Sequence, residues 1–256
     1  MRAPAWVRPL VTGAIVVAAV TACAPIEDET RRARSTLVIG IDVSGSFEST
    51  GNFDDAIEFA SHYLYGHIHG LGELARPSAV FVGSVGGERP GETKSFQPIH
   101  LFRDKSPQEI AAVLHEQFPS HQDGFTDFNA FFDRVATLVK RQGLILAPLN
   151  IVVFSDGIPD LTARPGDESR YSAIDLSVLE YLSRSVTVRL LYATPTVSVA
   201  WERDISRRRV RMWTVDHEVM VGWKEQMEPN IDPELDEKLW NWVRDNIDFR
   251  VRSKVL

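Results

Sequence analysis

Oxygen-bearing side chains recur at three places in the sequence, and they are of the types that bind hard cations. The five residues are Asp42, Ser44, Ser46, Thr126 and Asp156. In an extended backbone alternate side chains point to the same side, so the first three are expected to face one ligand. A set of hydroxyls with only two carboxylates suits Mg2+, Mn2+ or Ca2+ and does not suit zinc or copper.

Two apolar runs must position these side chains. One run extends from Leu37 to Ile41 and leads into Asp42, and the other extends from Ile151 to Phe154, shortly before Asp156. Continuous runs of this kind, rich in Ile and Val, are typical of strands in the middle of a parallel sheet. Because parallel strands end at the same edge of the sheet, we expect both acidic loops to meet there.

Apolar runs alternate with helical patterns from Ser35 onward, which predicts one α/β domain. Its fold class is a Rossmann-like, doubly wound, mostly parallel central sheet with helices on both faces and one antiparallel edge strand. Strands are expected at residues 37–42, 78–85, 96–102, 150–155, 186–192 and 210–215, the third of them antiparallel. Helices are expected at residues 53–64, 106–118, 128–139, 175–182, 196–206 and 232–246. Residues 216–227 are expected to extend a strand or to form a hairpin.

Residues 1–22 have the features of a secretory signal peptide. Arg2 and Arg8 make a basic start, and the apolar stretch from Leu10 to Val20 is too short to span a bilayer as an anchor. Cys23 follows directly and is the only cysteine of the chain, so no intramolecular disulfide can form.

The segment Val20-Thr21-Ala22-Cys23 resembles the lipobox of bacterial lipoproteins, although Leu is commoner than Val at its first position. The resemblance implies that Cys23 becomes the acylated amino terminus and anchors an exported protein in a membrane. Ala24 favours the outer membrane, with the protein facing the periplasm. Residues 23–35 would then be the lipidated cysteine and a polar tether. An ordinary signal peptide that leaves a free thiol and an uncleaved membrane anchor are the alternatives.

The three oxygen-bearing segments together resemble the von Willebrand factor A (VWA) family, over about residues 35–250. The segments are Asp42-x-Ser44-x-Ser46, Thr126 in Gly124-Phe125-Thr126-Asp127, and Asp156-Gly157. In order and placement they are similar to the metal-ion-dependent adhesion site of that family. Phe125 is a departure, because many members have a second glycine there. We therefore expect a VWA domain at residues 36–250 and a short tail at residues 251–256.

The resemblance also implies a role for each residue of the set. Ser44, Ser46 and Thr126 would bind a divalent cation directly, with Mg2+ favoured over Mn2+ or Ca2+. Asp42 and Asp156 would bind the cation directly or through water. A carboxylate from a partner protein would complete the coordination. The expected function is cation-dependent protein binding in the cell envelope, without catalysis.

Other functions remain open at this point. The metal site could be vestigial in a structural envelope protein, or the two acidic segments could be plain turns. A metal-dependent hydrolase would need further carboxylates, for which Asp127 and Asp160 are candidates, but no nearby residue is a convincing base. A haloacid dehalogenase type of phosphatase would need a second aspartate in place of Ser44. No glycine-rich phosphate-binding loop is present in the sequence.

Composition and charge restrict the partners. The chain of 256 residues is 44% hydrophobic, and its net charge of −7 argues against a nucleic-acid-binding surface. The basic cluster of Arg207, Arg208, Arg209 and Arg211 could bind anions or lipid headgroups, or could be a solvated surface. The histidines His62, His67 and His69 suggest a zinc site, but capping or solvated histidines are the simpler interpretation.

Overall fold

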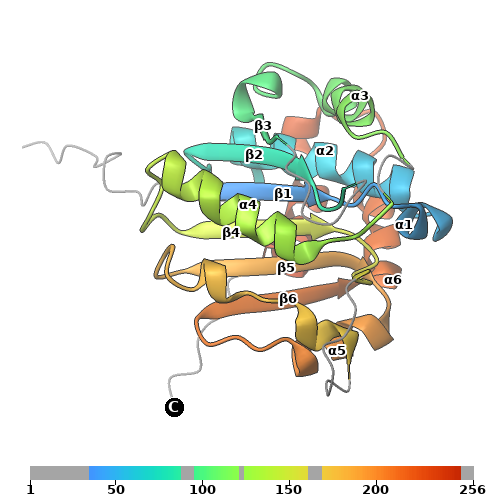
Figure 1. Ribbon diagram of the computed structural model, residues 1–256. Coiled ribbons are helices and arrows are strands. Elements are labelled where there is room, and N and C mark those ends of the chain that lie inside the picture. Colours follow the sequence, from blue (N-terminus) through green and yellow to red (C-terminus); the bar gives the residue numbers. More distant parts are fainter. Residues whose placement is uncertain (1–34, 88–94, 121–123, 161–168, 249–256) are drawn as a thin grey trace, which may run out of the picture. The chain divides into compact units, whose positions relative to one another are not determined.

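The computed structural model describes residues 35–87, 95–120, 124–160 and 169–248 (Figure 1). Several predicted segments lie outside the described residues. They are the signal peptide, Cys23, the tether up to residue 34, the last two residues of the predicted domain and the tail. Within these described ranges, no helix combines the length and the apolar character that a membrane-spanning segment requires.

Six strands form one sheet in the order β3-β2-β1-β4-β5-β6 (Figure 1). They are β1 (Thr36–Ile41), β2 (Ala79–Ser84), β3 (Gln97–Pro98), β4 (Leu149–Phe154), β5 (Val186–Ala193) and β6 (Val210–Asp216). The pair of β2 and β3 is antiparallel and the other neighbouring pairs are parallel. The predicted fold class, with its antiparallel edge strand, is therefore confirmed. The edge strand is shorter than predicted because the chain turns into a 3-10 helix at Ile99–Leu101.

Helices connect the strands, and several of them differ from the prediction. The α-helices are α1 (Gly45–Ser49), α2 (Phe53–His69), α3 (Pro107–Gln117), α4 (Phe128–Arg141), α5 (Pro195–Asp204), α6 (His217–Met220) and α7 (Glu237–Asn246). The 3-10 helices are η2 (Leu71–Glu73), η3 (Ile99–Leu101), η4 (Arg170–Ala173), η5 (Ser177–Leu179), η6 (Val221–Gln226) and η7 (Pro233–Leu235). Residues 175–182 form only a 3-10 turn instead of the predicted α-helix. Residues 217–226 are helical, so the predicted strand extension or hairpin is wrong.

Both faces of the sheet are covered, because alternate residues of each strand point in opposite directions. In β1, Ile39 and Ile41 belong to the buried apolar cluster that includes α2, α3 and α7. Val38 belongs to a second buried cluster that includes α4 and α5. Figure 1 shows α4 crossing one face of the strands. The two clusters explain why the central strands are apolar at nearly every position.

Helix α7 begins later in the chain than predicted, and Leu235 lies in the 3-10 turn before it. Leu235 is 66% exposed, whereas Trp240 is buried. Asp236 caps α7 by accepting the N–H of Leu239 at 3.0 Å, so the helix begins at Glu237, five residues after the predicted start at residue 232. The indole N–H of Trp240 donates to the carbonyl of Pro233 at 2.7 Å and fixes the preceding turn against the helix.

Candidate metal site

Asp42 and Asp156 follow two strands that are neighbours in the sheet. Strands β1 and β4 are parallel and in register, with Ile41 opposite Phe154. The N–H of Asp42 donates to the carbonyl of Phe154 at 2.9 Å, which continues the pairing into the loops. The structure therefore brings the two acidic segments together at the carboxyl edge of the sheet, as the sequence predicts.

The segment after Asp42 is helical, so the predicted extended arrangement of Asp42, Ser44 and Ser46 is wrong. Ser44 is the N-cap of α1, and its hydroxyl accepts the N–H of Phe47 at 3.4 Å. Phe47 is completely buried, which holds this short helix against the domain. The hydroxyls of Ser44 and Ser46 nevertheless lie 3.0 Å apart. They converge because both belong to the start of a helix, not because alternate residues of a strand share a side.

Asp42 is a fully buried carboxylate with two hydrogen-bond donors. Its Oδ1 accepts the N–H of Ser44 at 3.0 Å, and its Oδ2 accepts the hydroxyl of Ser155 at 2.5 Å. Burial raises the pKa of Asp42 from its ordinary value to about 6, the hydrogen bonds oppose that rise, and the charge of Asp156 adds to it. The hydrogen bonds of the protein therefore do not fully offset the free-energy cost of burying the negative charge of Asp42.

Asp156 is in a similar position on the neighbouring loop. Its Oδ1 accepts the N–H of Ile158 at 2.9 Å, and the hydroxyl of Ser46 also bonds to it. Burial raises the pKa of Asp156, and the nearby charge of Asp160 raises it further. Two buried carboxylates with raised pKa values lie at one edge, and a cation between them would stabilise both charged forms.

Thr126 supplies the third segment and is also completely buried. Its backbone is held by Asp160, which accepts the N–H of Thr126 at 2.8 Å and donates its own N–H to the Thr126 carbonyl at 3.1 Å. The hydroxyl oxygen of Thr126, by contrast, is buried and has no hydrogen-bond partner in the part of the chain that the structure describes. A buried polar atom without a partner costs free energy, so such atoms usually have a ligand, a water or a functional reason.

The loop after Asp156 is rigid for steric reasons. Gly157 has a φ of +76°, and a Cβ at this position would come within 2.5 Å of a methyl group of Leu190. The indole N–H of Trp201 donates to the carbonyl of Gly157 at 2.8 Å. Only glycine fits here, and the buried tryptophan fixes the position of the carboxylate that precedes it.

Two residues that hold the site were not predicted as members of it. Ser155 links the two acidic loops, because its hydroxyl donates to Asp42 and accepts the N–H of Gly157 at 2.9 Å. Asp160 appeared in the sequence only as a carboxylate that a hydrolase would need. Its position four residues after Asp156 was the only hint in the sequence that Asp160 lies near the site. Its hydrogen bonds with Thr126 depend on the fold.

The donor set fits a hard cation through its hydroxyls more than through its carboxylates. Among the described residues, no group of three or more His, Cys, Asp and Glu side chains is arranged to hold a metal ion. The zinc interpretation of the histidines therefore has no support among the described residues. Nδ1 of His62 bonds to the carbonyl of Glu58 and Nδ1 of His67 bonds to the carbonyl of Ala75, each at 3.0 Å.

Replacing Thr126 by valine is expected to have opposite effects without and with the cation. Valine has nearly the same shape and no hydroxyl, so in ion-free protein the change should raise the free energy of unfolding by about 1 kcal/mol. In Mg2+ the loss of an oxygen ligand should weaken binding about tenfold, since about 1.4 kcal/mol corresponds to a factor of ten. Urea denaturation with EDTA and with Mg2+ measures both effects. A loss of stability in both conditions would contradict a ligand role for this hydroxyl.

No model of a protein family matches this sequence, and no curated protein matches it. Among solved structures, the chain is similar to a von Willebrand factor type A protein from Catenulispora acidiphila, at 13% identity and a TM-score of 0.44. That match covers 82% of this chain and 41% of the other, so this chain spans less than half of its length.

Two further solved structures are similar to this chain. The SpRpn10 VWA domain has 12% identity and a TM-score of 0.42, with 80% of this chain and 93% of the other covered. The manganese-loaded TRAP protein of Plasmodium vivax has 12% identity and a TM-score of 0.42, with 74% and 71% covered.

The strand order and the placement of the helices identify the type of fold. The strand order, the antiparallel edge strand and the helices on both faces agree with the fold that the sequence resemblance implies. The three oxygen-bearing segments belong to the loop after β1, the loop before α4 and the loop after β4. The described part of this chain has the von Willebrand factor A type of fold.

Proposed function

We propose that this domain binds a divalent cation at the carboxyl edge and uses the cation to bind an acidic group of a partner protein. The observation that carries the proposal is the buried hydroxyl of Thr126, which has no hydrogen-bond partner among the described residues. The paired hydroxyls of Ser44 and Ser46 and the carboxylates of Asp42 and Asp156 would supply the other oxygens. Mg2+ is the favoured cation because the set is all oxygen and contains few charges.

The chemistry of partner binding follows from the small number of carboxylates. A cation bound by two carboxylates and neutral hydroxyls keeps enough positive charge to attract a third carboxylate. Ser46 is exposed, which leaves this side of the site open to a partner. Phe125 is 39% exposed, and its backbone pairs with Gly87 through two 3.1 Å hydrogen bonds. We propose that Phe125 contributes an apolar contact beside the cation.

The contacts of the additional carboxylates favour binding over hydrolysis. Asp160 is engaged with the backbone of Thr126, and Asp127 caps α4 by accepting the N–H of Ala130 at 2.9 Å. Both candidates for a hydrolytic role thus have structural tasks. We therefore propose a binding domain and not an enzyme.

The cellular setting is a proposal that rests on the sequence. Residues 1–22 would export the protein, and Cys23 would be acylated and anchor it in a bacterial membrane, with the outer membrane favoured. Several acyl chains at one terminus give stable anchoring, whereas a single chain binds marginally. The domain would then act in the cell envelope.

Cation-dependent capture of a partner tests this function. The full chain, immobilised and incubated with an envelope extract, is expected to retain a protein in Mg2+ and to release it in EDTA. Asp42→Ala should fail to retain that protein, while Asp54→Ala should retain it, because Asp54 is an exposed carboxylate of the first turn of α2. Equal retention with and without EDTA would instead favour a structural scaffold with a vestigial metal site.

A further inference from the structure

The edge of the sheet opposite the candidate metal site is basic. Four connections lead into β2, β4, β5 and β6 there, namely residues 75–78, 142–148, 183–185 and 205–209, which we call the amino edge. The charged residues of these connections are Arg76, Arg184, Arg207, Arg208 and Arg209. None of the four connections contains an acidic residue. The candidate site at the carboxyl edge, by contrast, contains the carboxylates of Asp42 and Asp156.

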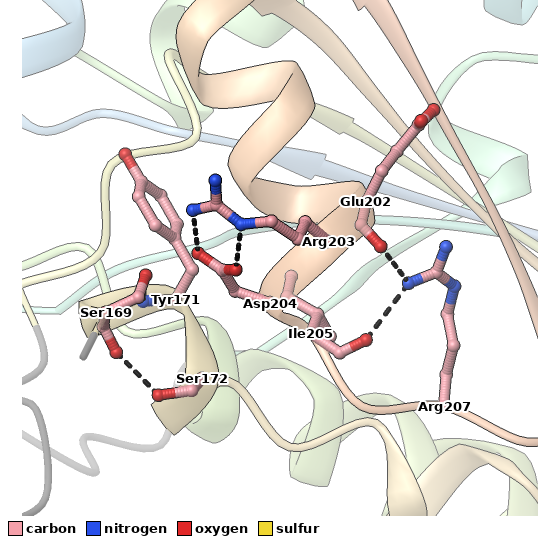
Figure 2. Close-up of polar contacts among 8 residues, drawn as sticks. All are labelled: Ser169, Tyr171, Ser172, Glu202, Arg203, Asp204, Ile205 and Arg207. Atoms are coloured by element: carbon pink, nitrogen blue, oxygen red, sulfur yellow. Dashed lines mark hydrogen bonds and ion pairs between the residues drawn. The ribbon is translucent and has the colours of Figure 1, made fainter. Parts of the chain in front are cut away.

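The side-chain hydrogen bonds of these arginines go to neutral groups. Arg207 donates to the carbonyls of Glu202 and Ile205, each at 3.0 Å, as Figure 2 shows. In contrast, the neighbouring Arg203 is paired with the carboxylate of Asp204 (Figure 2). A carbonyl orients a guanidinium but does not neutralise it, so the positive charge of Arg207 persists at the surface.

Arg76 at the amino edge is bonded in the same way. Arg76 donates to the carbonyl of His69 at 2.6 Å. Within the described ranges, none of the five forms an ion pair with a carboxylate. Glu180, which is buried, accepts the backbone N–H of Arg208 at 2.8 Å and, in the described part of the chain, forms no ion pair with its guanidinium.

Exposed apolar side chains lie among these charges. Leu146 is 71% exposed, Ile145 is 46% exposed and the neighbouring Tyr181 is 74% exposed. The backbone of Leu146 is fixed, because its N–H donates to the carbonyl of Leu182 at 2.8 Å. Its φ of +77° is costly for a leucine, and the fold keeps it there with the side chain in solvent. The guanidinium of Arg209 lies 5.9 Å from the centre of the Tyr181 ring.

The amino edge is also where the N-terminal part of the chain joins the domain. Ser35 accepts the N–H of Ser78, and the N–H of Thr36 donates to the carbonyl of Pro148, both at 2.8 Å. Cys23 precedes Ser35 by 12 residues in the sequence. A chain of that length reaches at most about 40 Å when fully extended. A lipid on Cys23 would therefore hold this edge close to the membrane surface.

We propose that the amino edge docks onto an anionic lipid surface, with the arginines at the headgroups and Leu146, Ile145 and Tyr181 at the level of the upper acyl chains. This inference rests on the proposed lipid anchor at Cys23. Basic residues beside exposed apolar and aromatic side chains are the composition of interfacial membrane contacts. In this orientation the carboxyl edge points away from the membrane, so the candidate metal site faces a partner.

Fluorescence quenching in vesicles tests the proposal on the full chain. Leu146→Cys and, as a control at the carboxyl edge, Ser49→Cys are labelled with a fluorophore and reconstituted into vesicles of phosphatidylethanolamine and phosphatidylglycerol. We expect lipid-attached quenchers to quench the label at position 146 and not the label at position 49. Arg184→Glu with Arg209→Glu should weaken the contact by at least about fivefold per arginine. The same reversal at Arg103 and Lys105, outside the amino edge, should leave it unchanged.

Two results would overturn the docking surface. The first is equal access of a water-soluble quencher to positions 146 and 49, and the second is crosslinking of position 146 between two copies, which would make this edge a self-association surface. Labelling the unsubstituted chain with a thiol-reactive fluorophore distinguishes a wrong docking surface from a missing lipid anchor. An acylated Cys23 has no free thiol and should not react. A reactive Cys23 would contradict the lipid anchor. In that case the quenching experiment would be repeated with Cys23→Ser added to each variant, and its result would decide whether the amino edge contacts the membrane.

Discussion

Mg2+ or Mn2+ at about one hundred times its dissociation constant is expected to raise the melting temperature of the metal-stripped chain by about 5–10 °C. A ligand that binds only the native state stabilises it by mass action, and this concentration corresponds to about 2.7 kcal/mol. The effect should be large because the ion would compensate two buried carboxylates and give the hydroxyl of Thr126 a partner. Differential scanning calorimetry of the full chain measures it.

Two matched variants test whether the increase in melting temperature comes from an ion at the carboxyl edge. Asp42→Ala should abolish the increase, and Asp54→Ala should leave it intact, because Asp54 is exposed and lies outside the donor set. EDTA should return the unsubstituted protein to its starting melting temperature. An equal increase in Asp42→Ala would place the ion elsewhere and would contradict the proposed site.

Replacing Asp42 by asparagine is expected to stabilise the ion-free protein at pH 7.5 by up to roughly 3 kcal/mol. The pKa of Asp42 is raised to about 6 in the folded protein, so folding opposes its ionisation. The folded state therefore binds a proton more tightly than the unfolded state does. This contribution to stability is present at low pH and is lost as the pH rises through about 6.

Urea denaturation in EDTA at pH 5, 6 and 7.5 checks this sign. The gain from Asp42→Asn should be largest at pH 7.5 and should shrink toward pH 5. Comparing the two proteins at each pH is essential, because burial lowers the pKa of His62 and His67 and opposes folding in acid in both. With saturating Mg2+ the sign should reverse, because the cation needs the carboxylate. A gain that does not depend on pH would contradict the assignment to Asp42.

The sequence predicted the strands and the placement of the two acidic loops better than the local geometry of those loops. Central parallel strands such as β1 and β4 are nearly continuous in apolar residues, so their ends could be located and the two acidic loops placed together. The short helix α1 was not predicted, because it depends on the capping by Ser44 and on the burial of Phe47. The cap is a local bond, but the burial of Phe47 is a tertiary effect that a five-residue segment does not reveal.

The same distinction applies to residues that support the site. Nothing in the sequence pairs Asp160 with Thr126, because 34 residues separate them and the contact exists only once α4 and β4 are packed. The amino edge is a second example. The arginine cluster at 207–209 is visible in the sequence, but Arg184 and Leu146 come from other loops and join it only in the folded sheet.

The most direct test of the central claim is calorimetric titration of the metal-stripped full chain with Mg2+ and Mn2+, beside Asp42→Ala. We predict saturable binding of one ion to the unsubstituted protein and none to the variant. Retention of binding in Asp42→Ala, or no binding in either protein, would contradict a cation site at the carboxyl edge, although the fold would stand.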